Sequence, residues 1–297
     1  IHFDETTGRL CAEAGVLLGE IQNIFVGRGW MLPVTPGTQF VTLGGAIAND
    51  VHGKNHHSYG SFGNHVTNIV LFRSDTGMQQ CNKKENSKLF QATIGGMGLT
   101  GIIVEVEIQL RPVLGGWLDC RAESFRSLKE FFDLSKKNDE RFEYSVSWVD
   151  ITTSEDSIRG ISFYANHSEC KDPLRDRKTI EFPITPPFSL INRLTQNIFN
   201  RIYYITNKKK LGYYREDFKK YFYPLDSVKN WNKIYGKNGF YQYQSVIPIE
   251  NSYDATSEML RLISQSKQGS FLMVLKHFGK IENAGMLSFP KPGITLA

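Results

Sequence analysis

The stretch of sequence that decides the fold is Pro36–Gly63, which reads PGTQFVTLGGAIANDVHGKNHHSYGSFG. Its Gly44-Gly45 pair is followed by small residues, so the backbone here can turn tightly or come within contact distance of a ligand. Successive peptide N–H groups in such a segment can bind a pyrophosphate. The segment has neither the GxGxxG fingerprint nor the Gly-Lys-Ser/Thr ending of a phosphate-binding loop. These residues alone leave two interpretations open, a ligand cradle and a tight turn between packed strands.

Four of the seven histidines lie between His52 and His65. A metal site would use His52, His56 and His57, but adjacent histidines in an extended segment point to opposite sides, and no carboxylate or cysteine stands at a familiar ligand spacing. A redox or proton-transfer site would use His52 and Lys54, whose N–H groups can stabilise negative charge on a cofactor ring or a substrate oxygen. The third interpretation is a polar, hydrogen-bonded loop.

The remaining pattern predicts an α+β chain. A second glycine cluster, Gly95–Gly101, runs into an alternating strand at Ile102–Leu110, and the two glycine clusters together suggest two backbone surfaces that close on one flat ligand. Apolar spacing predicts a helix within Gly15–Gly29 and another begun by Ser124. Further strands are expected at Val66–Ser74, Tyr144–Val149, Gly160–Ala165, Phe240–Ile247 and Ser270–His277.

Composition narrows the class of protein. The chain has 297 residues, 40% of them hydrophobic, which excludes a disordered chain and suggests one large or two ordinary domains. No apolar run reaches the ~18 residues that span a bilayer. A net charge of +5 is mild and does not favour nucleic acid as a partner. The chain lacks an initiator Met and ends in a strand-like segment, so we expect a protein truncated at both ends.

The motifs resemble a known family. The run Val41–Ala48, the HGKNHH motif at His52–His57 and the segment Gly60–Gly63 are similar to the FAD-binding domain of the vanillyl-alcohol-oxidase-type, or PCMH-type, flavoenzymes. The QYQxVIP motif within Phe240–Pro248 is similar to the decaprenylphosphoryl-ribose oxidase branch, and the resemblance spans nearly the whole chain. It implies a two-domain α+β fold, with a PCMH-type FAD-binding domain at 1–112 and an antiparallel-sheet substrate or cap domain at 113–297, both incomplete.

The resemblance also implies site residues and a non-covalent FAD, with no metal. His52 would lie beside the isoalloxazine ring and stabilise the reduced flavin, while Lys54 would face the substrate. Trp148, Gln242, Gln244 and Lys276 would line the sugar pocket, the two glutamines on one face of a strand. The expected FAD contacts are Gly37, Thr38, Val41, Thr42, Gly44, Gly45, Ala48, Asn49, Val51, His52, Gly60 and Ile103.

The implied reaction is the FAD-dependent oxidation of a secondary hydroxyl of a polyprenylphosphoryl pentose, ribose C2 to a ketone. It would be the first half of an epimerisation that supplies arabinose to the bacterial cell wall, completed by an NAD-dependent short-chain reductase. The expected partners are the lipid-linked sugar phosphate, that reductase and a membrane surface, and the expected location is cytoplasmic or peripheral to a membrane. The aromatic and basic stretch Ile198–Lys210 is either an apolar entrance for the lipid or a solvated charge run beside core aromatics.

Two alternative functions remain at this stage. The first is an FAD-linked aldonolactone or alditol oxidase that acts on a soluble sugar. The second is a catalytically inactive binding partner of a reductase, which is disfavoured by the joint presence of His52, Lys54, Gln242, Gln244 and Lys276.

Overall fold

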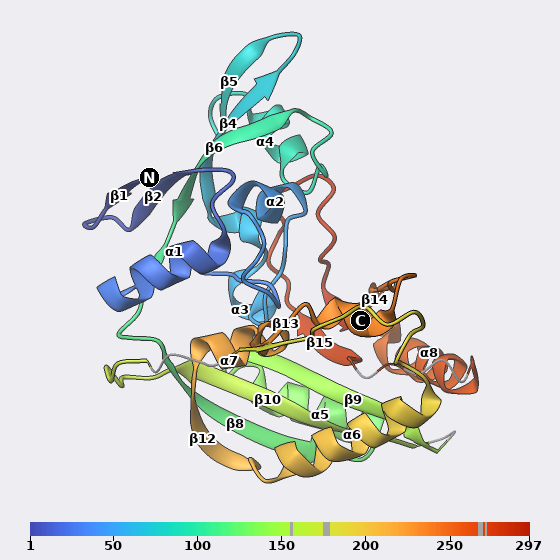
Figure 1. Ribbon diagram of the computed structural model, residues 1–297. Helices are drawn as coiled ribbons and strands as arrows, with labels where there is room; N and C mark the ends of the chain where they lie inside the picture. Colours follow the sequence, from blue (N-terminus) through green and yellow to red (C-terminus); the bar gives the residue numbers. More distant parts are fainter. Residues whose placement is uncertain (155–156, 175–178, 267–269, 271) are drawn as a thin grey trace.

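The computed structural model describes residues 1–154, 157–174, 179–266, 270 and 272–297. Two antiparallel sheets lie one above the other (Figure 1), a five-stranded sheet near the N-terminus and a seven-stranded sheet formed by the rest of the chain. The helices surround both sheets, so the expected α+β class is confirmed. The position of the boundary between two domains at residue 112 stays a prediction.

The five-stranded sheet has the order β1-β2-β6-β4-β5 and the seven-stranded sheet the order β12-β8-β10-β9-β15-β16-β14. Two short pairs, β3–β7 and β11–β13, complete the strands. The strands are β1 (His2–Asp4), β2 (Arg9–Glu13), β3 (Trp30–Met31), β4 (Val66–Arg73), β5 (Gly77–Asn82), β6 (Ile102–Gln109), β7 (Arg111–Pro112), β8 (Trp117–Phe125), β9 (Tyr144–Ser154), β10 (Ser157–His167), β11 (Ile180–Glu181), β12 (Gly212–Asp217), β13 (Val228–Lys229), β14 (Ser245–Pro248), β15 (Val274–Phe278) and β16 (Gly293–Leu296).

The helices follow the same numbering along the chain. The α-helices are α1 (Leu18–Phe25), α2 (Leu43–Ala48), α3 (His56–Tyr59), α4 (Ser87–Thr93), α5 (Leu128–Asn138), α6 (Arg193–Lys208), α7 (Phe218–Phe222) and α8 (Ser252–Ser266). The 3-10 turns are η1 (Val26–Arg28), η2 (Phe62–His65), η3 (Pro224–Ser227), η4 (Trp231–Tyr235) and η5 (Ile249–Asn251). No helix in the described ranges is both long and apolar enough to cross a membrane.

Strand β6 keeps its predicted alternation only in part. Val106 and Ile108 are buried in the core of the first sheet, as the alternation requires. Val70 and Leu71 are adjacent on β4, but their partners on β6, Glu105 and Ile103, are two residues apart. Val104 is the extra residue and forms a β-bulge. The bulge reverses the alternation at the start of the strand, so Ile103 packs against the core and Ile102 is exposed.

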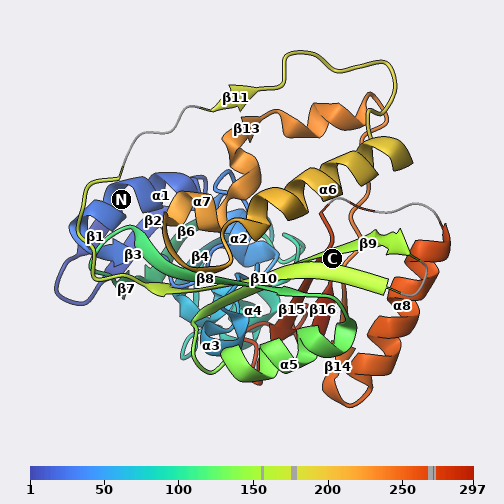
Figure 2. The ribbon, with the colours of Figure 1, turned by 90° about the horizontal axis from the view of Figure 1, so that it is seen from below.

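The two faces of the seven-stranded sheet carry different helices. Helices α5 and α8 cover the face that bears Val149 and Leu275, whereas α6 packs on the face that bears Trp148 (Figure 2). Side chains alternate along a strand, so Lys276, next to Leu275 on β15, lies on the same face as Trp148. This alternation places the lysine toward the space between the two sheets and α6.

Three boundary predictions need correction. Ser124 does not begin a helix, because Phe125 ends β8; Ser127 caps α5 instead, accepting a hydrogen bond from the Glu130 N–H at 3.1 Å. The strand expected at 240–247 begins only at residue 245. The strand expected at 270–277 begins at residue 274, and position 271 lies outside the described residues.

Candidate active site

The histidine-rich loop between the two sheets is fixed by one buried carboxylate. Asp50, with a backbone φ of 40°, accepts hydrogen bonds from the Ser61 hydroxyl at 2.8 Å and from the Gly63 N–H at 2.7 Å. His52 pairs with Ser61 in an isolated β-bridge. Asp50 therefore ties the two ends of the loop together and sets the position of the His52 imidazole.

His52, Lys276, Gln244 and Thr295 form a chain of polar contacts. The Lys276 Nζ lies 3.2 Å from His52 Nδ1. An ammonium group can only donate, so Nδ1 accepts and the imidazole proton resides on Nε2. The Gln244 amide lies against this Nε2, with its Oε1 at 3.4 Å as the possible acceptor and its nitrogen at 3.2 Å, and the same amide nitrogen donates to the Thr295 hydroxyl at 2.8 Å. Thr295 is the cross-strand neighbour of Lys276, so β15 and β16 hold both ends of the chain.

The site is positively charged and half-buried. Burial, together with the charge of Lys276, lowers the pKa of His52 well below its ordinary value, so the imidazole is neutral. Burial also lowers the pKa of Lys276 to about 8 and that of Lys54 to about 7. Among the described residues neither lysine forms an ion pair with a carboxylate, because Lys54 donates to the backbone carbonyls of Tyr221 and Phe222. Such a site is suited to an anionic or electron-rich ligand.

The structure brings together only some of the predicted pocket residues. Gln244 and Lys276 both contact His52. Gln242 is exposed in the segment before β14, so the expected strand face shared with Gln244 is wrong. Trp148 is 4% exposed and its ring packs against that of Tyr203 on α6 at 4.7 Å between centroids. The roles of all these residues toward a substrate stay predictions.

The Gly44-Gly45 segment forms the start of α2 and not a free cradle. The first four N–H groups of this helix, from residues 43–46, donate to Val16 O, Ala14 O, the Thr42 hydroxyl and Thr42 O, at 2.8–3.1 Å. A Cβ on Gly44 would lie 2.8 Å from the Ala14 Cβ, so this glycine permits close packing of α2 on the turn after β2. The prediction of unpaired N–H groups at Gly44 and Gly45 is therefore wrong.

The loop just before α2 is the more open surface. Gly37 is exposed, a Cβ there would meet nothing within 4 Å, and neither its N–H nor that of Thr38 has a partner in the described part of the chain. The Gln39 N–H donates to the Asp226 carboxylate at 2.8 Å, which fixes the loop to η3. Unlike residues 43–46, this loop leaves peptide N–H groups for a ligand.

The two glycine clusters meet at the other end of α2. The Gly95 N–H donates to Ile47 O at 2.9 Å and the Met97 N–H to Ala48 O at 2.7 Å. Met97 and the adjacent Leu99 are exposed. The two clusters are thus adjacent, as the sequence suggested. The other predicted cofactor residues, Val41, Thr42, Asn49, Val51 and Gly60, lie along the same segment, between the loop before α2 and the loop that carries His52.

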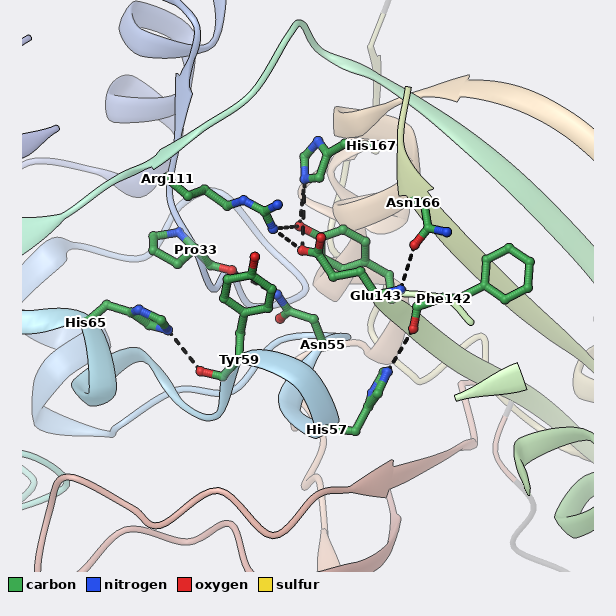
Figure 3. A network of polar contacts seen from close by, with 11 residues as sticks. Pro33, Asn55, His57, Tyr59, His65, Arg111, Phe142, Glu143, Asn166 and His167 are labelled. Carbon is green, nitrogen blue, oxygen red and sulfur yellow. Dashed lines mark hydrogen bonds and ion pairs between the residues drawn. The ribbon is translucent and has the colours of Figure 1, made fainter. Parts of the chain in front are cut away.

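The neighbouring histidines have structural roles. His57 Nε2 donates to Phe142 O at 2.9 Å and His65 Nε2 to Tyr59 O at 2.9 Å (Figure 3). The His56 ring packs against Phe278, and burial lowers the pKa of His56 to about 4, so it is neutral. Two of the three interpretations of the cluster therefore apply to different residues: His52 belongs to the charged site, and the others are packed or hydrogen-bonded within the loop.

A buried ion pair joins this loop to the second sheet, and the sequence pattern gave no signal for it. Arg111, between the two sheets, pairs with Glu143 at the start of β9, and both side chains are about 15% exposed. The Arg111 guanidinium also lies over the Tyr59 ring at 4.6 Å, while the Glu143 N–H donates to Asn166 at 2.7 Å (Figure 3). The network fixes the position of the loop relative to β9 and β10.

Comparison with known proteins gives the family. Residues 1–82 match the FAD binding domain family. The chain is 34% identical, over 99% of its length, to a decaprenylphosphoryl-beta-D-ribose oxidase of Mycolicibacterium smegmatis, of which it spans 66%. The chain belongs to the PCMH-type family of FAD-linked oxidoreductases. It is also 30% identical to a mouse delta(24)-sterol reductase over 43% of this chain and 25% of that protein. A putative D-arabinono-1,4-lactone oxidase of Neurospora crassa is 25% identical over 46% of this chain and 24% of that protein. The chain thus corresponds to only part of each relative.

The residues present fit the cofactor of this FAD-linked family. His52 is neutral and accepts from Lys276, and the half-buried lysines lack a carboxylate partner among the described residues, as suits an anionic cofactor. The open loop at Gly37 and Thr38 has the unpaired peptide N–H groups that a pyrophosphate requires. FAD is the cofactor of this chain.

Proposed function

We propose that the chain forms the flavin and sugar sites of an oxidoreductase that oxidises a secondary hydroxyl of a polyprenylphosphoryl pentose, ribose C2 to a ketone. The observation that supports this most is the half-buried group of Lys276, His52 and Gln244, together with 34% identity, over 99% of the chain, to an oxidase of decaprenylphosphoryl ribose. The oxidation is the first half of an epimerisation. A separate NAD-dependent short-chain reductase completes it by reducing the ketone from the other face.

FAD, when bound, supplies the acceptor for the hydride that leaves the sugar carbon. The chain's own residues prepare the site for this transfer. Lys276 fixes the tautomer of His52, so that the Nε2–H, which lies against Gln244 in the free chain, can be donated to a ligand where negative charge accumulates. Thr295 holds the Gln244 side chain, so that the Gln244 amide lies beside the imidazole and can bind a sugar hydroxyl there. Lys54, held at the backbone of α7, adds a second positive charge that attracts the sugar phosphate.

The second candidate is the oxidation of a soluble sugar, which the similarity to a putative arabinonolactone oxidase favours. The two functions make different demands on the surface. A lipid-linked substrate needs an apolar approach to the site, whereas an alditol or a lactone needs none. The exposed apolar residues of α6, which packs on Trp148, favour the lipid-linked substrate.

An anaerobic titration distinguishes these functions. The purified full-length protein with FAD is mixed in turn with a polyprenylphosphoryl ribose, a free alditol and an aldonolactone, and the visible flavin absorbance is recorded. Bleaching by the lipid-linked sugar alone is the expected result. Bleaching by a soluble sugar alone would replace the proposal with the second candidate. A protein that stays colourless in excess FAD would refute both.

A further inference from the structure

Helix α6 has an apolar stripe that faces solvent. Asn192 caps the helix, accepting from the N–H groups of Leu194 and Thr195 at 3.0 and 3.2 Å, so the helix begins at Arg193. Its buried face consists of Gln196, Asn200 and Tyr204. The opposite face carries large apolar side chains at helical spacing, each more than half exposed: Leu194 (69%), Ile198 (51%), Ile202 (59%) and Ile205 (51%). This is the reverse of the pattern of a helix that lies on a protein surface in water.

Basic residues surround this stripe and acidic residues are absent from it. Between Asn192 and Lys210 the sequence has five basic residues and no acidic one: Arg193, Arg201, Lys208, Lys209 and Lys210. This local charge equals the net charge of the whole chain, +5. Lys210 pairs with Glu216 at 3.2 Å, and in the described ranges the other four have no carboxylate partner. Arg201 and Lys208 follow one edge of the stripe, since residues seven apart share a helix face.

An apolar stripe bordered by unpaired basic residues matches the surface of an anionic lipid bilayer. Such a helix lies in the plane of the interface, with its apolar side chains among the acyl chains and its cations among the headgroups. A protein or nucleic acid partner matches less well, because the four large exposed side chains of the stripe are all aliphatic and offer no hydrogen bond. The charge therefore selects lipid as the occupant.

The other side of the same helix packs on the face of the sheet that bears Lys276. The Tyr203 ring packs against that of Trp148, and Trp148 on β9 pairs with Val274 on β15, two residues before Lys276. Figure 2 shows α6 across the strands, on the side of the sheet opposite to α5 and α8. A bilayer bound to the exposed stripe would thus lie on the side of the sheet that also bears Lys276.

We propose that α6 is a membrane-docking helix that binds anionic bilayers and brings the site to lipid-linked substrate. The substrate part of this inference rests on the proposed function, whereas the binding of bilayers does not. The apolar side chains of the stripe insert into the bilayer, and the basic residues at its edge are attracted to the anionic headgroups. Binding requires both.

Co-sedimentation with vesicles tests the docking directly. The full-length protein is mixed with vesicles of phosphatidylglycerol and phosphatidylcholine, and with phosphatidylcholine alone, in the absence of any sugar. The wild type is expected to sediment with the anionic vesicles and to be released by high salt. The double variant I198N/I202N should bind them roughly tenfold or more weakly. The charge variant R201Q/K208Q, which keeps the stripe, should also bind more weakly.

The matched control is I249N/L262N, because these two residues are similarly exposed but lie in η5 and α8, on the other face of the sheet. It should bind like the wild type. Equal binding of I198N/I202N and the wild type, or no binding of the wild type, would overturn the proposal. Oxidation is then measured with a lipid-linked sugar in vesicles and with a short-chain, water-soluble analogue. The docking variants should lose activity only on the vesicle substrate. Absence of oxidation by the wild type on both substrates would refute the proposed function and leave the vesicle result to decide the docking.

Discussion

The Nζ of Lys276 lies 3.2 Å from the Nδ1 of His52, and this contact determines how the imidazole can act. The lysine makes the imidazole a donor at Nε2 and, by its charge and the shared burial, keeps it from taking a second proton. Negative charge that accumulates on a bound ring or a substrate oxygen would therefore be close to the neutral His52 imidazole, which can donate a hydrogen bond, and to the positive charge of Lys276. The arrangement favours stabilisation of negative charge over removal of a proton by His52.

Replacing Lys276 should therefore impair the reduction of bound flavin. The variant Lys276→Met keeps the length of the side chain but loses the charge and the hydrogen bond to His52. We expect the rate of flavin reduction by substrate, measured by anaerobic stopped-flow absorbance, to fall by about 10²-fold or more. Lys280→Met, a change of an exposed lysine two residues after β15, serves as the control and should keep the rate. An unchanged rate in Lys276→Met would remove the lysine from the mechanism.

The buried lysine should also make the stability of the apoprotein depend on pH. The pKa of Lys276 is about 8 in the folded chain against 10.5 for an ordinary lysine. Between these values the unfolded state binds more protons than the folded state, so the contribution of Lys276 to the unfolding free energy rises with pH. Below about pH 8 the lysine is charged in both states, and its charge then lowers the unfolding free energy of the wild type by the full amount. The stability advantage of Lys276→Met over the wild type should therefore be largest there. Urea unfolding of both apoproteins from pH 7 to pH 10 should show this difference shrinking as pH rises. A difference that is constant or grows would contradict the lowered pKa.

The two glycines at the ends of the cofactor segment should respond differently to alanine. In Gly44→Ala the new Cβ would approach the Ala14 Cβ to 2.8 Å, and we expect a loss of about 1–3 kcal/mol in unfolding free energy. In Gly37→Ala the Cβ meets nothing within 4 Å, so stability should be unchanged. If FAD phosphates bind at the open loop, Gly37→Ala should instead weaken FAD binding. Chemical unfolding and a fluorescence titration with FAD separate the two effects, and equal stability of the two variants would refute the packing role of Gly44.

The Arg111–Glu143 pair should be important for stability because it is largely buried. Glu143→Gln leaves the Arg111 guanidinium without its counter-charge beneath the histidine-rich loop, and we expect a loss of about 3–5 kcal/mol in unfolding free energy. The nearby exposed Glu140→Gln has no such partner and should have little effect. Thermal or urea unfolding checks both, and a small loss in Glu143→Gln would show that the pair is only a surface contact.

The sequence predicted the elements whose cause is local. Strand β4 was predicted and most of β6 follows from alternation, and the turn chemistry of the glycine clusters correctly marked where the chain folds back on itself. The bulge at Val104 was invisible, because a bulge depends on how two distant strands pair and not on the pattern of either one. The prediction that Ser124 caps the helix failed for the same reason. Phe125 packs in the core of the second sheet and so extends β8 past Ser124, and the helix can begin only after Ser127.

The candidate site was predictable only through resemblance. Nothing in the spacing of His52, Gln244 and Lys276, which lie on a loop, an irregular segment and a strand, indicates that they meet; tertiary structure alone brings them together. Thr295 and Arg111 were missed because each acts through a partner far away in sequence. The expectation of free N–H groups at Gly44-Gly45 was wrong because oxygen atoms of the chain itself already accept hydrogen bonds from them. Which acceptors lie near these N–H groups depends on the tertiary structure and cannot be read from the sequence.

The central claim is that this site takes a hydride from C2 of a lipid-linked pentose. The most direct measurement is the anaerobic rate of flavin bleaching in the full-length protein with polyprenylphosphoryl ribose carrying deuterium at C2, compared with deuterium at C3. The account predicts slower bleaching with the C2 label and an unchanged rate with the C3 label. Slowing by the C3 label alone, or equal rates for the C2-labelled and unlabelled sugars under conditions where bleaching is limited by chemistry, would contradict it.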